Sequence, residues 1–206
     1  MRNDKTSMII IEDHPVMRKG LADWFQKTGR WNVTGTASAL DEAKAILAHL
    51  YAKGSKVDML LLDIQLKDGW GLDIIPWLKK KNAELPLLAV YSAFDDYAHV
   101  SAALSMGVKA YVTKYRSESE LEKALRTVLD GKTHIDESAQ EKFHTAIEVF
   151  SLLTKREGEI LSFIKDGLSN KQIAVKLGIK RETVDNIVSC IYDKTGIHSR
   201  PELLKL

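Results

Sequence analysis

Five short runs of apolar, often β-branched residues recur along the first part of the chain, and a segment with helical periodicity follows each of them. The expected strands are 8–12, 31–37, 57–63, 85–91 and 110–113, and the expected helices are 15–28, 39–53, 70–82, 95–106 and 117–130. Parallel strands need a crossover helix at each step, and runs such as MIII and MLLL suit strands that are buried on both faces. We therefore predict an α/β, doubly wound, five-stranded parallel sheet.

The pattern changes after Gly131, and from Leu153 onward only helical periodicity remains. We expect an α/β domain over 1–130, a linker over 131–150 with a short helix near 138–149, and a small all-α domain over 151–206. Its expected helices are 154–167, 169–177, 180–195 and a short one from 199. A chain of 206 residues with 45% apolar residues can bury a core in each of two such domains.

The sequence also limits where the protein acts. No run approaches the 18 or so uncharged apolar residues of a membrane span, and the first ten residues do not resemble a signal peptide. The single cysteine, Cys190, excludes an internal disulfide framework. We therefore expect a cytoplasmic protein with no membrane partner.

Polar residues follow four of the five expected strands: Glu12 and Asp13, then Asp63, Ser92 and Lys114. The carboxyl ends of parallel strands meet at one edge of a sheet, where ligands bind in open α/β folds. Three carboxylates repel one another unless a cation joins them, and oxygen ligands without His or Cys favour Mg²⁺, with Mn²⁺ as an alternative. The simpler interpretation of Asp63 alone is a helix N-cap.

Several motifs within residues 7–130 resemble the receiver domain of response regulators in two-component signalling. They are "EDHPVMRKGL" from residue 12, which is similar to the NarL/FixJ subfamily, "LLLDIQL" around Asp63, "YSAF" around Ser92 and "GVKAYVTK" ending at Lys114. His14 and Pro15, within the first of these, are expected to begin a helix.

The resemblance implies a role for each matching residue. Asp63 accepts a phosphoryl group from the phosphohistidine of a sensor histidine kinase or from a small acyl phosphate. The implied Mg²⁺ ligands are Asp13, Asp63 and the backbone carbonyl of Gln65, with Glu12 acting through water. The implied phosphoryl partners are Lys114 and Ser92, and Tyr111 is implied to rotate inward behind Ser92. A carboxylate nucleophile whose transferred group is neutralised by cations suits phosphoryl transfer.

One departure from the family pattern lies in the loop after the acceptor. Relatives usually have a proline four residues after it, whereas this chain has Lys67. Without the fixed φ of proline, this loop is expected to be more mobile. Gln65 and Phe94 lie where side chains would control the access of water to the phosphoryl group, and we expect them to alter its lifetime.

The carboxy-terminal pattern predicts a helix, a tight turn and a second helix. Ser169 is expected to cap the first of the pair, "LGI" to form the turn, and the next helix to bury Val184, Ile187, Val188 and Ile191. This geometry inserts an exposed helix face into a DNA major groove. A small helical dimerisation domain remains the alternative on this pattern alone.

The same segment resembles the LuxR-type helix-turn-helix through "LLTKREGE", "GLSNKQIA", "LGI", the Thr183-Val184 pair and "KTGIHSR". That resemblance implies double-stranded DNA as a partner. Residues 151–206 carry ten Lys and Arg against seven Asp and Glu, a mild basic bias of +3. We expect phosphate contacts from Lys171, Lys180, Arg181 and Lys194, and further DNA contacts from Thr183, Asp185, Asn186 and Ser189.

The recognition helix departs from the family at two positions. Asp185 replaces the usual lysine, and Ile187 replaces the usual histidine. An aspartate repels phosphates but can accept a hydrogen bond from cytosine N4, so both outcomes stay open. With few cations we expect modest affinity per monomer, raised by homodimerisation on two half-sites.

Three classes of function fit these patterns to different degrees. The favoured one is a transcription regulator controlled by phosphorylation, not a dedicated enzyme. A phosphatase that forms a phosphoaspartate is weaker, because the haloacid dehalogenase type needs a second aspartate where this chain has Gln65. A protein-binding module that lacks phosphorylation or DNA binding is supported only by Lys67 and Asp185.

Overall fold

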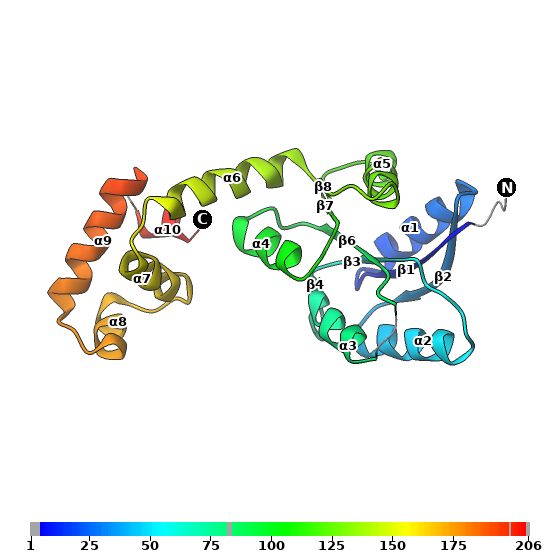
Figure 1. The fold of residues 1–206 in the computed structure, drawn as a ribbon, viewed down its shortest axis with the longest axis horizontal. Coiled ribbons are helices and arrows are strands. Elements are labelled where there is room, and N and C mark those ends of the chain that lie inside the picture. Colours follow the sequence, from blue (N-terminus) through cyan, green and yellow to red (C-terminus); the bar gives the residue numbers. More distant parts are fainter. Residues whose placement is uncertain (1–4, 82–83, 198, 205–206) are drawn as a thin grey trace. The chain divides into compact units, whose positions relative to one another are not determined.

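The computed structural model describes residues 5–81, 84–197 and 199–204 (Figure 1). The chain divides into two compact units, each described here by itself: Met1–Asp95 with His99–Ala139, and Asp96–Ala98 with Gln140–Leu206. Residue 82, the expected end of one helix, lies outside the described residues. Among the helices of the described ranges, none is both long and apolar enough to cross a membrane.

A parallel sheet of six strands forms the first unit, in the order β2-β1-β3-β6-β7-β8. Its strands are β1 (Thr6–Ile11), β2 (Trp31–Ala37), β3 (Met59–Leu62), β6 (Leu87–Ser92), β7 (Ala110–Thr113) and β8 (His134–Ile135). The expected parallel α/β fold is confirmed, and all five expected strands are present. The expected number of strands was wrong, because the two residues of β8 are too few to show a periodic pattern.

Helices cover both faces of this sheet. They are α1 (Pro15–Lys27), α2 (Leu40–Ala52), η1 (Gly71–Asp73) with α3 (Ile74–Lys80), α4 (Tyr97–Ser105) and α5 (Glu118–Leu129). α1 and α5 share one buried core, in which the rings of Phe25 and Trp31 meet edge to face at 5.5 Å. Ile46 of α2 lies against Gly35 of β2, and Figure 1 shows α2 and α3 on the side of the sheet away from α5.

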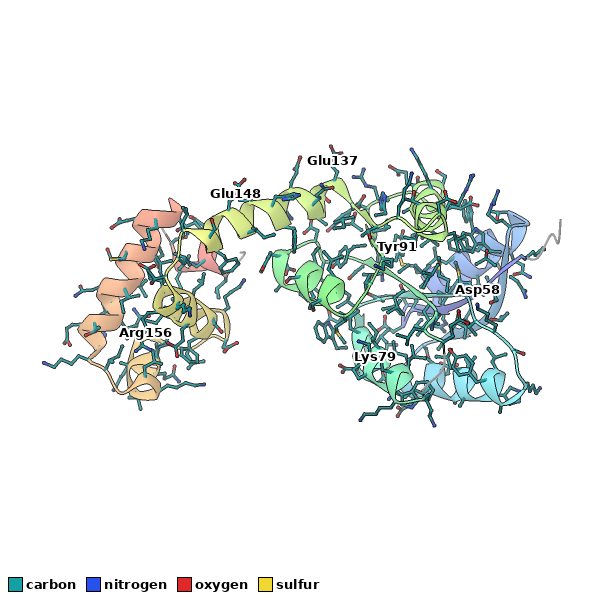
Figure 2. All side chains as sticks on the ribbon, in the orientation of Figure 1. Asp58, Lys79, Tyr91, Glu137, Glu148 and Arg156 are labelled. Carbon is teal, nitrogen blue, oxygen red and sulfur yellow. The ribbon has the colours of Figure 1, made fainter. Side chains whose placement is uncertain are left out.

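Hydrogen bonds from polar side chains fix both ends of the central strands. At the amino end, the carboxylate of Asp58 accepts hydrogen bonds of 2.8 Å from the backbone and the hydroxyl of Ser7. At the other end, the hydroxyl of Tyr91, labelled in the interior of this unit in Figure 2, donates to the backbone oxygen of Arg116 at 3.2 Å. The first contact joins β1 to the start of β3 and the second joins β6 to the segment after β7, while backbone pairing keeps β1, β3 and β6 in register.

The segment expected as a linker contains regular structure along most of its length. β8 pairs with β7, and α6 (Glu137–Ser151) begins directly after Asp136. The carboxylate of Asp136 is 4% exposed and accepts hydrogen bonds from the backbone and hydroxyl of Thr113 and from the guanidinium of Arg116. The start of this segment is therefore part of the first unit.

The second unit is helical, as expected. It contains most of α6 together with α7 (Lys155–Lys165), α8 (Asn170–Leu177), α9 (Arg181–Thr195) and α10 (Arg200–Leu203). Thr154 and Ser169 each form a capping box with the residue three positions later, so the expected cap at Ser169 is present. Gly178 ends α8 at φ +64°, a backbone conformation that favours glycine and allows the tight turn into α9.

The core of the second unit joins these helices through one cluster of apolar side chains. Val184, Val188 and Ile191 of α9 are buried in it, and Ile187 packs against it partly buried, as their helical spacing predicted. The remaining buried members are Ile160, Leu161, Ile164, Ile173, Ala174 and Leu203. Burying this face leaves the opposite side of α9 exposed.

Candidate functional site

Three carboxylates meet at the carboxyl edge of the sheet. Glu12 and Asp13 follow β1 and Asp63 follows β3, and because these strands pair in register, the residues after them are neighbours. The backbone N–H of Asp63 continues the ladder by donating to Ile11 at 2.8 Å. Glu12, Asp13 and Asp63 are only 1%, 9% and 5% exposed. The structure thus brings together the acids that strand order predicted to converge.

The ammonium group of Lys114 lies between two of these acids. Its Nζ is 2.7 Å from Asp63 Oδ2 and 2.7 Å from Glu12 Oε2. Burial disfavours the charged lysine, but hydrogen bonds and charge from Asp63 and Glu12 outweigh it, so the pKa of Lys114 rises above its usual value. Lys114 therefore stays protonated at neutral pH, as a positive charge beside the Asp63 carboxylate.

Asp13 keeps an oxygen without a hydrogen bond, although its carboxylate is buried. Its Oδ1 lies 2.9 Å from His14 Nδ1, but not in hydrogen-bonding geometry. A buried, unsatisfied carboxylate oxygen is costly, and a bound cation would satisfy it. Glu12, Asp13, His14 and Asp63 each offer a ligand atom, and these atoms lie within 4.8 Å of one another. The residues present therefore fit a divalent cation.

His14 has more contacts with the acids than the sequence indicated. It precedes α1 as its N-cap and Pro15 follows as expected, yet the His14 side chain makes no capping bond. Its Nδ1 instead lies 3.0 Å from Glu12 Oε1. The sequence could not indicate this contact, because a His-Pro pair is expected to begin a helix whatever the orientation of the His14 ring.

Asp63 does not cap a helix. η1 begins at Gly71 and α3 has Asp73 at its N-cap, both well after Asp63. Asp63 Oδ1 accepts a long hydrogen bond of 3.4 Å from the backbone N–H of Gln65. The carboxylate therefore faces the edge of the sheet, where it contacts Lys114 and lines a cavity.

Ser92 and Tyr111 lie behind this edge on β6 and β7. Both are fully buried, and the Ser92 Oγ accepts a hydrogen bond from the backbone of Phe94 at 3.4 Å. The Tyr111 hydroxyl donates to the Phe94 carbonyl at 2.9 Å. The Phe94 ring stacks on His99 at 4.4 Å. The backbone of Phe94 thus connects Ser92, the implied phosphoryl partner, with Tyr111, the residue implied to rotate inward behind it.

A cavity of about 600 Å³ opens at this edge. Its lining residues are Asp13, His14, Met17, Asp63, Gln65, Leu66, Lys67, Ala93, Phe94 and Lys114. Gln65 and Phe94, expected to control water, are among them, and so is Lys67.

The segment around Lys67 is a short hairpin. β4 (Gln65–Leu66) pairs antiparallel with β5 (Gly69–Trp70), and Lys67 and Asp68 form the turn. Directly after it, the N–H of Gly71 donates to the Ile64 carbonyl at 2.6 Å. A Cβ at Gly71 would lie 1.9 Å from the backbone oxygen of Asp63, so only glycine allows this approach. Hairpin pairing, rather than a proline, shapes this loop.

The residues expected to bind DNA lie on α8, on α9 and at the N-cap of α9, and they fall into two groups. One group consists of exposed residues: Lys171, Lys180, Thr183, Asn186 and Ser189. The other group makes contacts within the unit. Lys194 donates to Glu157 at 2.8 Å, and Asp185 accepts a hydrogen bond of 2.7 Å from Asn170 and lies 3.4 Å from Arg181.

The comparisons with known proteins identify both units. The response regulator receiver domain model matches residues 8–126, more than half of the chain. The chain belongs to the response regulator family. The model of bacterial regulatory proteins of the luxR family matches residues 151–206, so this response regulator is of the NarL/FixJ type, with a LuxR-type helix-turn-helix for binding DNA. It is not a dedicated enzyme, which removes the phosphatase alternative.

Relatives of this response regulator match it along nearly its whole length. It is 31% identical over 202 residues to the DNA-binding transcriptional activator DevR/DosR of Mycobacterium tuberculosis, covering 95% of this chain and 90% of that one. It is 31% identical over 212 residues to the oxygen regulatory protein NreC of Staphylococcus aureus, covering 96% and 94%.

Solved structures share the fold. RcsB from Salmonella enterica serovar Typhimurium, bound to a promoter in the presence of a phosphomimetic, matches with a TM-score of 0.71 and 23% identity, covering 98% of this chain and 97% of that one. The response regulator ChrA of a heme-sensing two-component system matches with a TM-score of 0.53 and 27% identity, covering 97% and 94%.

Proposed function

We propose that this response regulator accepts a phosphoryl group on Asp63 from a sensor histidine kinase and thereby controls DNA binding by its second unit. The observation that carries the proposal is the position of Asp63. Its carboxylate is buried, contacts the Lys114 ammonium, and lines a cavity that also contains Asp13. A carboxylate placed in this way is a nucleophile with a fixed cation beside it.

In the proposed reaction, an Asp63 carboxylate oxygen attacks phosphorus. The new O–P bond forms as the bond to the phosphohistidine nitrogen, or to the acyl phosphate oxygen, breaks and leaves its electron pair on the donor. Lys114 neutralises charge on the transferred group. The Ser92 hydroxyl lies behind the site, where a small movement would bring it to a phosphoryl oxygen, and buried Tyr111 would move with it through Phe94.

The implied Mg²⁺, or Mn²⁺ in its place, would supply positive charge that offsets the charge on the phosphoryl group. The proposed ligands are Asp13, Asp63 and the Gln65 carbonyl, with Glu12 acting through water. The orphaned Asp13 Oδ1 supports this assignment. The Lys114 ammonium contacts Glu12 and Asp63 and supplies positive charge beside these acids.

For the output, we propose that exposed Lys171, Lys180 and Arg181 contact DNA phosphates. Thr183, Asn186 and Ser189, on the exposed side of α9, would read base edges. Lys194 and Asp185 are proposed as DNA contacts only after they exchange their present partners. Homodimerisation on two half-sites would raise the affinity for DNA. A sensor histidine kinase and DNA as partners would place the protein in the cytoplasm.

We retain the proposed organisation of receiver domain 1–130, linker 131–150 and DNA-binding domain 151–206. α6 fills most of the linker. A signal that starts at Asp63 would reach the second unit through this segment.

The deciding experiment compares wild type with Asp63→Asn after treatment with Mg²⁺ and acetyl phosphate or beryllofluoride. A phosphate-affinity gel measures phosphorylation by acetyl phosphate, and gel filtration measures dimerisation. The matched control is Asp73→Asn, which changes an exposed aspartate without a side-chain capping bond. We expect wild type and Asp73→Asn to be phosphorylated and to dimerise, and we expect Asp63→Asn to stay unphosphorylated. Phosphorylation that persists in Asp63→Asn would refute the assignment.

DNA binding is tested separately by selection from random duplexes, with the full-length protein in both phosphorylation states. We expect one enriched motif with two half-sites. The absence of any enriched motif would favour the protein-binding alternative.

A further inference from the structure

We propose that His14 is a nitrogen ligand of the cation site, which therefore takes transition-metal ions, such as Mn²⁺, Co²⁺ and Ni²⁺, in preference to Mg²⁺. The inference rests on the cation site of the proposed function and changes its donor set from oxygen alone to oxygen plus imidazole. Imidazole suits first-row transition metals, whereas Mg²⁺ favours carboxylate, carbonyl and water.

The distances around the His14 ring match those between neighbouring ligands. His14 Nδ1 lies 2.9 Å from Asp13 Oδ1 and 3.0 Å from Glu12 Oε1. Two ligand atoms in adjacent positions of an octahedron with bonds of about 2.0–2.1 Å lie about 3 Å apart. One ion can therefore contact the imidazole and the Asp13 carboxylate with little rearrangement.

The unsatisfied oxygen of Asp13 is an independent indication of a ligand. Asp13 is 9% exposed, and its Oδ1 has no hydrogen-bond partner although the ring nitrogen of His14 is close. If the pair were arranged only for a hydrogen bond, this oxygen would accept one. The two atoms lie 2.9 Å apart without a hydrogen bond, and this arrangement fits two ligands of a common ion.

The backbone holds the His14 ring at this place. His14 has extended backbone angles of φ −73° and ψ 111°, and Pro15 fixes the first turn of α1 after it. The backbone N–H of His14 also donates to Glu12 Oε1 at 3.2 Å. The His14 side chain is 72% exposed and lines the cavity, so an ion entering from solvent can reach it.

Coordination through Nδ1 requires the neutral tautomer that carries its proton on Nε2. The hydrogen bond between Nδ1 and Glu12 would then be replaced by contact of both groups with the ion or its water. The exposed Nε2–H would then donate a hydrogen bond to solvent.

The test uses untagged, full-length protein and Mn²⁺ as the probe. Free Mn²⁺ is followed by its EPR signal during titration, and bound Mn²⁺ is then examined by pulsed EPR for a directly coordinated nitrogen. The matched variant is His14→Asn, which keeps a polar side chain but has no imidazole. Asp13→Asn tests whether the ion is bound at this site. Ni²⁺ and Mg²⁺ affinities are measured on the same proteins by calorimetry.

We expect a nitrogen signal in wild type that is lost in His14→Asn while Mn²⁺ stays bound, and weak Mn²⁺ binding in Asp13→Asn. His14→Asn should lower Ni²⁺ affinity roughly tenfold or more, since residues that only hydrogen-bond to the ligands of a metal already contribute that much. The same variant should change Mg²⁺ affinity less than about threefold.

Bound Mn²⁺ without a nitrogen signal in wild type, or a signal that persists in His14→Asn or Asp13→Asn, would overturn the inference and leave the proposed Mg²⁺ site standing. If wild type binds neither Mn²⁺ nor Mg²⁺, the cation of the proposed function fails together with this inference. The two failures are therefore distinguishable.

Discussion

The carboxylate of Asp68 accepts a hydrogen bond of 2.7 Å from the backbone N–H of Leu40, the first residue of α2. Asp68 belongs to the turn of the hairpin that follows Asp63, so this bond attaches the hairpin to the start of a neighbouring helix. It also satisfies one of the first N–H groups of α2, which have no acceptor within the helix. The loop without the family's proline is thus anchored by another residue.

Replacing Asp68 with Ala should free the hairpin and leave the Leu40 N–H without its acceptor. We expect a loss of about 1 kcal/mol in the free energy of unfolding, as for other capping residues, measured by urea denaturation. Amide exchange in β4 and β5 should accelerate more than in the sheet. Asp23→Ala, on the exposed side of α1, is the control and should change neither quantity. Unchanged exchange in the hairpin would show that Asp68 does not anchor it.

Replacing Gly71 with Ala should destabilise the receiver domain. The new Cβ would lie 1.9 Å from the backbone oxygen of Asp63, so the chain beside the acceptor must move. We expect a loss of roughly 1–3 kcal/mol by urea denaturation and slower phosphorylation by acetyl phosphate. Gly20→Ala in α1 meets nothing within 4 Å and should instead stabilise by roughly 0.5–1 kcal/mol. Equal effects of the two changes would contradict this account.

Acid should weaken the second unit through Glu157. The hydrogen bond from Lys194, followed by one from the Thr154 backbone, lowers the pKa of Glu157 from 4.5 to about 2. A carboxyl whose pKa is lower in the folded state stabilises the fold above pH 4.5, and this stabilisation is lost as the pH falls toward about 2. Amide exchange in α7 and α9 should therefore accelerate across this range.

The control for this pH dependence is a pair of variants. Glu157→Gln should weaken the α7–α9 contact at neutral pH and flatten the dependence between about pH 4.5 and 2. Glu159→Gln, which removes a surface partner of Arg156, should keep the wild-type dependence. A slope that survives in Glu157→Gln would assign the acid sensitivity to other groups.

Two substitutions at Asp185 separate its charge from its hydrogen bond with Asn170. Asp185→Ala removes both, whereas Asp185→Asn keeps an oxygen that can accept from Asn170. If the negative charge restrains Arg181 and repels phosphates, both variants should bind random duplex more tightly, measured by fluorescence anisotropy at low salt. Only Asp185→Ala should lose stability, by about 0.5–1.5 kcal/mol. Weaker DNA binding by both variants would instead indicate that Asp185 contacts a base.

The parts of the fold that could be predicted are those with a continuous physical signal. The strand from Met59 to Leu62 is buried on both faces, so its sequence is apolar throughout and its carboxyl end is easily located. The convergence of Glu12, Asp13, Asp63 and Lys114 follows from strand order alone. The helices of the second unit follow from their spacing and from caps such as Ser169.

The features that escaped prediction depend on contacts between distant residues. β8 and the hairpin of β4 and β5 have two residues in each strand, too few for periodicity. The bond from Leu40 to Asp68 and the bond from Asn170 to Asp185 each join different elements. The direction of the His14 ring is a choice of rotamer, which spacing does not specify.

The buried carboxylate of Asp136 links the end of β7, next to Lys114, to the start of α6. It holds Thr113, which is bonded covalently to Lys114, and it directly precedes Glu137, the first residue of α6. Figure 2 labels Glu137 at the start of that helix. Lys114 is therefore connected to the first residue of α6 through one peptide unit, the hydrogen bonds between Thr113 and Asp136, and one more peptide unit. If Asp63 is phosphorylated as proposed, a movement of Lys114 would reach the first turn of α6 along this route without passing through any surface side chain.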